Sequence, residues 1–268
     1  MISQVFELLA DARKVGIGFA VAGLRQGLGR GRIRFSWRGK TWTIRGKDTD
    51  FQTMRQALRD GTFELGRPKI ERQIAARYHE LLEAGKTPVI LDLGANVGSA
   101  AIWFADRFPR ALIVAVEPHP GNCEILARNL EHIPGAILVR SAAGSRPGFV
   151  ELDEKWLHAG SWGIQTRRTN SGVPVTTIAE LAGKVEHGSL FIVKMNIEGF
   201  EEDLFESNVE WLDEAEAVYI ALHDDFILDS RPSRTFQAAF ANRDFRLFSL
   251  ENQVVYVRDR TSGEAKPC

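Results

Sequence analysis

The sequence predicts an α/β fold with a mostly parallel sheet and helices on both of its faces. The first observation is an apolar, β-branched strand at residues 89–93 that runs into a glycine turn and a helix-forming stretch at 99–108. The second is the order that follows, a strand at 112–116, a helix at 121–132 and a strand at 136–140. Such regular alternation of strands and helices is typical of parallel sheets.

The elements around this alternating region follow from local patterns. Apolar residues alternate around Arg38-Gly39-Lys40 and predict a β-hairpin over 32–45. Asp48-Thr49-Asp50 is typical of a capped helix start, and a second helix is expected at 69–84. The remaining expected elements are an irregular stretch at 144–174, a short helix beginning at 177–181, a strand at 190–195, a helix at 200–212, a strand at 218–222, and an antiparallel pair at 245–250 and 254–258.

Three parts of the chain are expected. Residues 1–85 form an N-terminal helical and β-hairpin extension, 86–260 the main domain and 261–268 a tail. The longest apolar run of the opening 1–31 covers only 15–24, about half of what spans a bilayer, so no transmembrane helix is expected. We expect instead a helix that packs on its own domain or on a partner in a homodimer, with peripheral contact to a membrane surface as the alternative.

The composition is that of an ordinary globular protein. Of 268 residues, 44% are apolar and 26% charged, and 34 Lys and Arg stand against 35 Asp and Glu. Because phosphate backbones select clustered basic surfaces, the overall balance gives no sign of a nucleic-acid partner. Cys123 and Cys268 lie too far apart in the sequence to indicate a disulfide framework or a metal knuckle. A cytoplasmic location is expected.

The glycine turn after the first central strand indicates a nucleoside site. Gly94 and Gly98 let the backbone approach a ligand closely, and Asp92 stands at the exit of the strand. The spacing is Gly-x-x-x-Gly, not the Gly-x-Gly-x-x-Gly that seats a dinucleotide pyrophosphate. Glu117, at the end of the next strand, is placed to accept both ribose hydroxyls, although a surface acid at a strand end is the alternative interpretation.

Four segments together resemble the FkbM family of S-adenosylmethionine-dependent methyltransferases. They are Asp-x-Gly-Ala-Asn-x-Gly at 92–98, Glu117-Pro118, Val-Thr-Thr-Ile at 175–178 and Lys-Met-Asn-Ile-Glu-Gly-Phe-Glu at 194–201. The resemblance extends over about 43–257 and implies a class I methyltransferase fold, a Rossmann-like seven-stranded sheet whose last strand is antiparallel. It also implies methyl transfer from S-adenosyl-L-methionine, most often to a hydroxyl oxygen.

The resemblance assigns residues to the cofactor. The glycine turn would line its methionine and ribose side, Glu117 would hold the ribose, and the residues after the third strand would border the adenine. The expected cofactor-binding residues are Asp92, Gly94, Ala95, Asn96, Gly98, Glu117, Pro118, Ser141 and Ala142.

The catalytic end departs from the family pattern at Asn196, where the family usually has Asp. Asn can hydrogen-bond but cannot act as a carboxylate base or a charged metal ligand. We therefore expect the acceptor's proton to go to His223, whose imidazole has an intrinsic pKa near neutrality, with Glu198 as the second candidate. Lys194 and Asn196 complete the expected catalytic set.

Two further features concern the acceptor side. A metal-free site is expected, and the alternative is a divalent cation held by Glu198, His223, Asp224 and Asp225. Trp156, His158 and Trp162 fit a lid over the acceptor, with a core or dimer role for either Trp equally open.

The expected function is O-methylation of a hydroxyl on a sugar, glycan or secondary metabolite, so that the partner is a small-molecule or glycan acceptor. N-methylation of an amine or amide is one alternative, because a neutral nucleophile makes the missing Asp less costly. A catalytically silent cofactor-binding protein is another. A nicotinamide oxidoreductase is the fold-level rival, and the missing Gly-x-Gly-x-x-Gly pattern counts against it.

Overall fold

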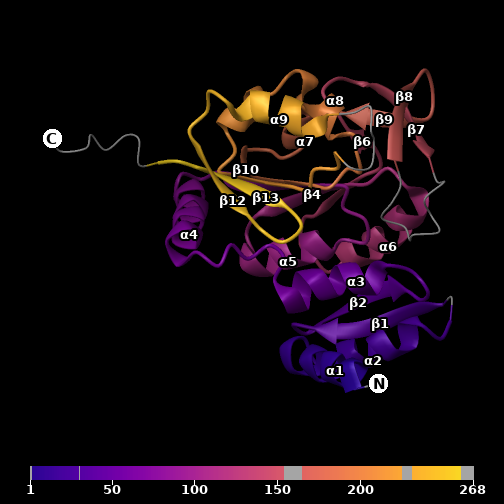
Figure 1. The fold of residues 1–268 in the computed structure, drawn as a ribbon. Helices are drawn as coiled ribbons and strands as arrows, with labels where there is room; N and C mark the ends of the chain where they lie inside the picture. The colour runs from indigo at the N-terminus through magenta and orange to yellow at the C-terminus, as the bar shows by residue number, and fades with distance from the viewer. Residues whose placement is uncertain (1, 30, 154–164, 225–230, 261–268) are drawn as a thin grey trace.

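The main sheet of the computed structural model has seven strands, and the structure describes residues 2–29, 31–153, 165–224 and 231–260. The strands lie in the order β12 (Phe245–Ser249), β13 (Val254–Arg258), β11 (Ala217–Ile220), β10 (Gly188–Met195), β3 (Thr87–Leu93), β4 (Leu112–Val116) and β5 (Ile137–Val139). β13 pairs antiparallel with both of its neighbours, and the other pairs are parallel. The predicted seven-stranded, mostly parallel sheet with an antiparallel last strand is confirmed (Figure 1).

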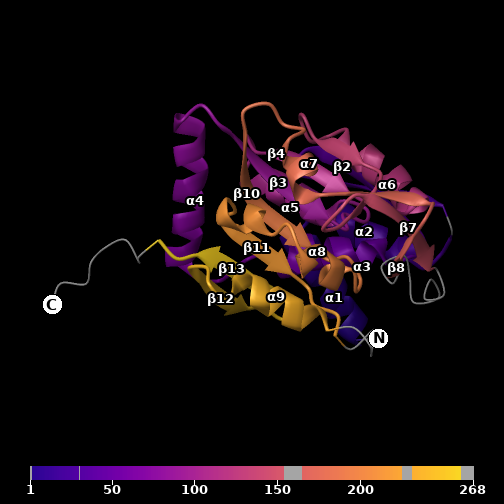
Figure 2. The same cartoon turned by 90° about the horizontal axis from the view of Figure 1, so that it is seen from above.

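Helices cover both faces of this sheet, as Figures 1 and 2 show from two directions. One apolar cluster joins the sheet to α4 (Pro68–Glu83), α5 (Ser99–Arg107) and α6 (Pro120–Leu130). A second joins it to α7 (Ile178–Ala182), α8 (Glu201–Glu206) and α9 (Pro232–Phe240). Strands covered on both faces read as continuous apolar runs, which is why the central strand was recognisable from the sequence.

The N-terminal extension packs against the helix layer below the sheet. It contains α1 (Ile2–Lys14), α2 (Ile17–Gln26), the hairpin β1 (Arg32–Trp37) and β2 (Lys40–Arg45), α3 (Asp50–Arg55) and the π-helix η1 (Gln56–Asp60). The hairpin is confirmed, and the opening segment forms two helices where one was expected. Phe19 of α2 is fully buried, with its ring centroid 5.0 Å from that of Phe35 and 4.6 Å from that of Phe51. One side of α2 therefore packs on the chain's own hairpin and α3.

A second sheet of four strands corrects the expectation of an irregular stretch at 144–174. Its order is β6 (Ala142–Ala143), β9 (Val173–Thr176), β7 (Gly148–Asp153) and β8 (Gln165–Thr169). Val150 is the one fully buried side chain of β7, and β8 has none, so the apolar alternation that marks a strand is weak here. The proposed lid residues Trp156, His158 and Trp162 lie outside the described residues.

Two helices also differ from expectation. The helix expected over 200–212 is divided into α8 and a 3-10 helix, η3 (Glu210–Asp213), with Asn208 between them at a positive φ of 57°. α9 was not anticipated from the sequence, and Phe236 and Phe240 on its inner side are buried. Among the described residues, no helix combines the length and the apolar character needed to cross a membrane.

Candidate active site

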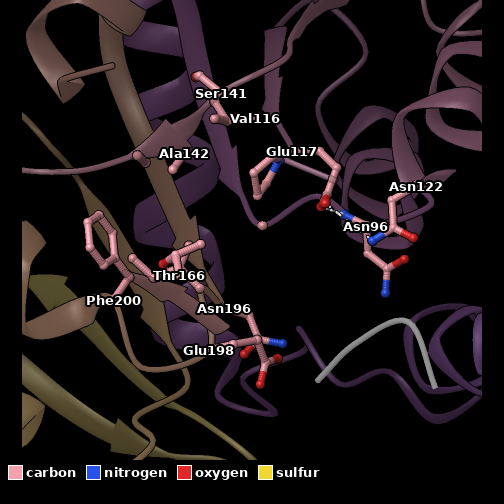
Figure 3. Close-up of a pocket in the computed structure, with 14 residues that line it drawn as sticks. Asn96, Val116, Glu117, Asn122, Ser141, Ala142, Thr166, Asn196, Glu198 and Phe200 are labelled. Carbon is pink, nitrogen blue, oxygen red and sulfur yellow. Dashed lines mark hydrogen bonds between the residues drawn. The ribbon is translucent and has the colours of Figure 1, made fainter. Parts of the chain in front are cut away.

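A cavity opens at the carboxyl ends of the central strands β3, β4 and β10, where open α/β sheets bind their ligands. Figure 3 shows Glu117, Asn96 and Asn122 along one side of it and Asn196 and Glu198 along another. Eight residues that the sequence predicted for the site line this cavity: Gly94, Asn96, Glu117, Pro118, Ser141, Ala142, Asn196 and Glu198. Val116, Asn122, Ala143, Thr166, Ile197 and Phe200 complete the lining.

The glycine turn is fixed to the strands on both sides of it. Gly94 has a φ of 69°, and a Cβ at this position would lie only 1.9 Å from the carbonyl oxygen of Asn196. The backbone N–H groups of Gly94 and Ala95 both donate to the Val116 carbonyl at 3.0 Å. Gly98, the residue immediately before α5, has a φ of 92°. Only glycine permits this close approach, so Gly94 serves the packing of the turn against the segment after β10. Ala95 and Gly98 support the turn and do not line the cavity.

Glu117 is buried at the end of β4 with its carboxylate held by three donors. Its Oε2 accepts from the Asn96 backbone N–H at 2.8 Å, and its Oε1 accepts from the His119 N–H at 2.9 Å and the Asn122 Nδ2 at 3.2 Å. Burial raises the pKa of Glu117, while the three donors favour the ionised form and oppose that rise. The carboxylate therefore has a fixed position at the cavity wall.

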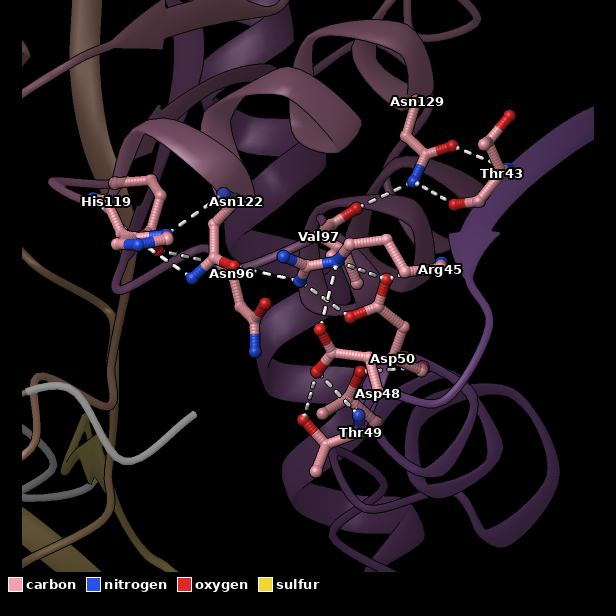
Figure 4. Close-up of polar contacts among 12 residues, drawn as sticks. Thr43, Arg45, Asp48, Thr49, Asp50, Asn96, Val97, His119, Asn122 and Asn129 are labelled. Atoms are coloured by element: carbon pink, nitrogen blue, oxygen red, sulfur yellow. Dashed lines mark hydrogen bonds and ion pairs between the residues drawn. The ribbon is translucent and has the colours of Figure 1, made fainter. Parts of the chain in front are cut away.

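A residue that the sequence analysis missed supports this arrangement from the N-terminal hairpin. Arg45 donates through Nη2 to Asn122 Oδ1 at 2.8 Å and to Asp50 Oδ1 at 2.7 Å, and through Nε to Asp50 Oδ2 at 3.0 Å (Figure 4). Asn129 similarly joins Thr43 of the hairpin to Val97 of the glycine turn. Arg45 and Asn122 are 77 residues apart in the sequence, so no local pattern could have revealed the contact.

Replacing Arg45 with Lys is expected to weaken binding of S-adenosylhomocysteine about three- to tenfold, the value of roughly one net hydrogen bond. A lysine ammonium cannot hold both Asp50 oxygens and Asn122 in the fork geometry of a guanidinium, so Asn122 loses its fixed orientation toward Glu117. Calorimetric titration measures the affinity, and Arg38→Lys, in the exposed turn of the same hairpin, is the matched control. If Arg45→Lys and Arg38→Lys bound S-adenosylhomocysteine equally well, Arg45 would not support the cofactor site through Asn122.

Three buried polar atoms at the cavity have no hydrogen-bond partner among the described residues. They are Asn96 Oδ1, Thr166 Oγ1 and Asn196 Oδ1, and all three residues belong to the lining. An unsatisfied buried polar atom costs about 1–3 kcal/mol, so such atoms are normally paired. A polar ligand that fills the cavity would satisfy them, which fits the amino-acid and ribose groups of S-adenosylmethionine.

Asp92 and Lys194 form a buried ion pair behind the turn and do not line the cavity. They are register partners on the adjacent central strands β3 and β10, with Lys194 Nζ 2.9 Å from Asp92 Oδ1. Lys194 Nζ also donates to the Gly94 carbonyl at 3.1 Å. Asp92 is fully buried, and its Oδ2 has no hydrogen-bond partner within the described ranges. The ion pair thus fixes the backbone of Gly94, the first glycine of the turn, through Lys194.

Glu198 and His223, the two candidate bases, lie close together, and of the two only Glu198 lines the cavity. His223 Nε2 is 3.6 Å from Glu198 Oε2, and its Nδ1 lies 2.8 Å from Oε1 of the fully buried Glu201. Glu198 has a positive φ of 51°, an uncommon conformation for a non-glycine residue that is frequent at functional sites. Burial raises the pKa of Glu198 from 4.5 to about 7, although the nearby His223 opposes the shift.

Asp224, the next residue after His223, accepts a hydrogen bond at Oδ1 from Ser233 Oγ of α9 at 2.7 Å. Asp225, the fourth member of the suggested cation cluster, lies outside the described residues. Within the part of the chain that the structure describes, no group of three or more His, Cys, Asp and Glu residues is placed to hold a metal ion.

The sheet order, the glycine turn after its central strand and the buried acid after the next strand define a class I S-adenosylmethionine-dependent methyltransferase. The model of the methyltransferase FkbM domain matches residues 92–226, and the chain belongs to this family, whose methyl donor is S-adenosylmethionine.

Two curated relatives are methyltransferases. The hexuronic acid methyltransferase AglP of Haloferax volcanii is 25% identical over 146 residues, which are 53% of this chain and 59% of that protein. The methyltransferase sdnD of Sordaria araneosa is 29% identical over 77 residues, 28% of this chain and 30% of that protein. The chain therefore spans less than two thirds of either relative. Among solved structures, magnesium protoporphyrin IX methyltransferase from Synechocystis PCC 6803 is 11% identical with a TM-score of 0.36, covering 79% of this chain and 92% of that one.

Proposed function

We propose that this enzyme transfers a methyl group to a hydroxyl oxygen of a sugar, glycan or secondary metabolite. The proposal depends on Glu198, whose carboxyl lies in the cavity wall and has a pKa raised to about 7. His223 Nε2 lies 3.6 Å from its Oε2. A hydroxyl acceptor must lose a proton during transfer, and a base with a pKa near the working pH is suited to take it. The relative AglP, a hexuronic acid methyltransferase, supports a sugar as the acceptor class.

The lining of the cavity supports an assignment of the cofactor-binding residues. Glu117 would accept the ribose hydroxyls, because its carboxylate is fixed at the wall by three donors. Asn96 would offer the amino-acid or ribose end its Oδ1, which has no hydrogen-bond partner among the described residues, and Ser141 and Ala142 would border the adenine. Three of the expected residues would not contact the cofactor and would instead hold the glycine turn in place: Asp92, Ala95 and Gly98.

The protein's contribution to the transfer is alignment and proton acceptance. S-adenosylmethionine supplies a methyl group already activated by its sulfonium sulfur. Asn196 Oδ1, which has no hydrogen-bond partner in the described part of the chain, would accept from the acceptor's hydroxyl and orient it toward Glu198, which takes the proton. Glu201 holds the His223 ring through Nδ1, so that its Nε2 faces Glu198. In this position His223 would stabilise Glu198 while that carboxylate takes the acceptor's proton. Asn196 thus replaces the family's usual Asp as a positioning group.

An acceptor panel tests the proposal. The purified protein is incubated with methyl-labelled S-adenosylmethionine and, separately, with methyl glucoside, methyl glucuronide and glucosamine, and the products are identified by mass spectrometry and NMR. We expect an O-methyl ether on a hydroxyl, because Glu198 is placed to take the proton that a hydroxyl loses on transfer. Methylation of the amine alone would favour the N-methyltransferase alternative. Cofactor binding with no transfer to any acceptor would favour a silent binding protein.

Replacing Glu117 with Gln is expected to weaken binding of S-adenosylhomocysteine about 10- to 150-fold, since charge-assisted hydrogen bonds contribute about 1.5–3 kcal/mol. The amide keeps the size of the side chain but removes the charge, and its NH2 would face either the Asn96 donor or the His119 and Asn122 donors. Calorimetric titration measures the loss, with Glu131→Gln at the exposed end of α6 as control. Unchanged affinity would refute the ribose role of Glu117, and tight binding of NADH instead would revive the oxidoreductase alternative.

A further inference from the structure

Seven of the nine large apolar side chains that are exposed among the described residues lie within the first 28 residues. Their exposed fractions run from 37% for Val21 to 80% for Leu28. The set, here called the outer apolar face, consists of Val5, Phe6 and Leu9 on α1, Ile17, Val21 and Leu24 on α2, and Leu28 just beyond it. Exposed apolar residues are ordinary when scattered, but a group of this size marks an interaction surface.

Helix geometry places these side chains on the outside of the molecule. Ile17, Val21, Leu24 and Leu28 follow the i, i+4, i+7, i+11 spacing of one helix face. The opposite side of α2 carries the buried Phe19 and packs on β1 and α3. Figure 1 shows α1 and α2 as the outermost layer, on the far side of the hairpin from α5 and α6. α2 is therefore apolar on both sides, which is typical of a helix covered on both.

The longer N-terminal segment that also includes the hairpin β1–β2 carries a strong excess of positive charge. Residues 1–47 contain ten Lys and Arg against two Asp and Glu, whereas the rest of the chain contains 24 against 33. Arg13 follows Leu9 by one helical turn, and Arg25 follows Val21 by one turn, so both extend the outer apolar face at the helix ends. Both are exposed, as are Lys14, Arg34, Lys40 and Lys47.

Exposed apolar side chains next to exposed basic ones indicate which kind of partner binds the outer apolar face. A second copy of the chain would bring the same patch against itself and place the basic residues of both copies together, which is unfavourable. A nucleic-acid backbone would use the basic residues and leave the apolar side chains in water. An anionic bilayer interacts with both kinds of residue, because its acyl chains take up apolar side chains and its headgroup phosphates attract Lys and Arg.

We infer that α1 and α2 dock this protein on the surface of an anionic lipid bilayer through the outer apolar face. With 13 and 10 residues, the helices are about 20 and 15 Å long, shorter than the hydrocarbon core of about 30 Å, so they lie along the surface. Arg13 and Arg25 extend their aliphatic stems beside the apolar side chains and reach the phosphates with their guanidinium groups. The inference does not depend on which acceptor the enzyme methylates.

Vesicle sedimentation with the full chain tests it. Vesicles of phosphatidylcholine with and without phosphatidylglycerol are compared at low and high salt. Leu24→Ser and Leu247→Ser form a matched pair, because these leucines are 56% and 55% exposed and Leu247 lies on β12, outside the face. Arg25→Gln is paired with Arg72→Gln, an exposed arginine of α4. Titration with S-adenosylhomocysteine shows that each variant keeps its fold, and light scattering reports the oligomeric state.

The wild-type protein is expected to bind the phosphatidylglycerol vesicles and to lose binding at high salt. Leu24→Ser should weaken partitioning about tenfold, from the lost insertion of one leucine. Arg25→Gln should weaken it about fivefold. Neither control variant should change it. Absence of binding to the anionic vesicles, or equal losses in Leu24→Ser and Leu247→Ser, overturns the inference.

Two further results would replace the bilayer by another occupant. A wild-type dimer that Leu24→Ser dissociates, without vesicle binding, assigns the face to a second copy. Binding that falls only in Arg25→Gln and is competed by duplex DNA assigns it to a phosphate backbone.

Discussion

Replacing Glu198 with Gln is expected to lower kcat about 100- to 10,000-fold, the usual contribution of a positioned general base. The amide keeps the shape of the side chain in the cavity wall but cannot accept the acceptor's proton. Binding of S-adenosylhomocysteine should change little, because the proposed cofactor contacts lie at Glu117 and the glycine turn. Turnover is measured with whichever sugar of the acceptor panel is methylated. Glu210→Gln, an exposed carboxylate of η3, is the control.

The pH dependence gives a second, independent readout of the same group. Burial raises the pKa of Glu198 to about 7, so the side chain is mostly protonated below that pH and cannot act as a base. Turnover of the wild-type enzyme should therefore rise as the pH increases through about 7, and this limb should vanish in Glu198→Gln. If the variant keeps both the rate and the limb, the proton goes elsewhere, and His223 becomes the leading candidate again.

The raised pKa of Glu198 also affects stability: the free energy of unfolding should fall as the pH rises toward about 7. A carboxyl whose folded pKa is raised holds its proton more tightly in the folded state than in the unfolded chain. Its contribution to the free energy of unfolding is then greatest at low pH and is lost between about 4.5 and about 7. The pH at which Glu198 would become able to act as a base therefore lies at the upper end of this range, where the loss of stability is nearly complete.

The centre of the fold was predictable because it depends on local patterns. The continuous apolar run of β3 and the glycine turn after it are visible in the sequence, and β4 begins and ends at the predicted residues. The strands of the second sheet were missed because few of their side chains are buried. A strand whose stability depends on its neighbours' hydrogen bonds leaves little trace in its own composition.

The cavity wall was predicted in part, for a related reason. Eight expected residues line it because they follow directly from the ends of parallel strands. Arg45 and Asn122 were missed, since their contact depends on how the hairpin packs on α6. Glu201 was quoted within a motif but given no role, and only the fold shows its carboxylate against His223. Residues that support a site through distant contacts require the three-dimensional structure.

Removing one partner of the buried pair Asp92 and Lys194 is expected to lower the free energy of unfolding by about 3–5 kcal/mol. Lys194→Met leaves a fully buried carboxylate without its cation, and Asp92→Asn leaves the ammonium of Lys194 in a mostly buried place. The double variant Asp92→Asn with Lys194→Met removes both charges and should recover most of the loss, because buried pairs contribute little beyond an apolar replacement. Urea unfolding of the four proteins measures the coupling, and strictly additive losses would show that the two charges do not depend on one another.

The same four proteins separate a structural role of Asp92 from a role in cofactor binding. If Asp92 acts only by holding Lys194 beneath the Gly94 carbonyl, the double variant should recover affinity for S-adenosylhomocysteine together with stability. If the carboxylate also takes part in holding the methionine end, stability returns in the double variant but affinity does not. The full burial of Asp92 behind the turn favours the first outcome, because a ligand in the cavity would meet Gly94 and Asn96 before it reached that carboxylate.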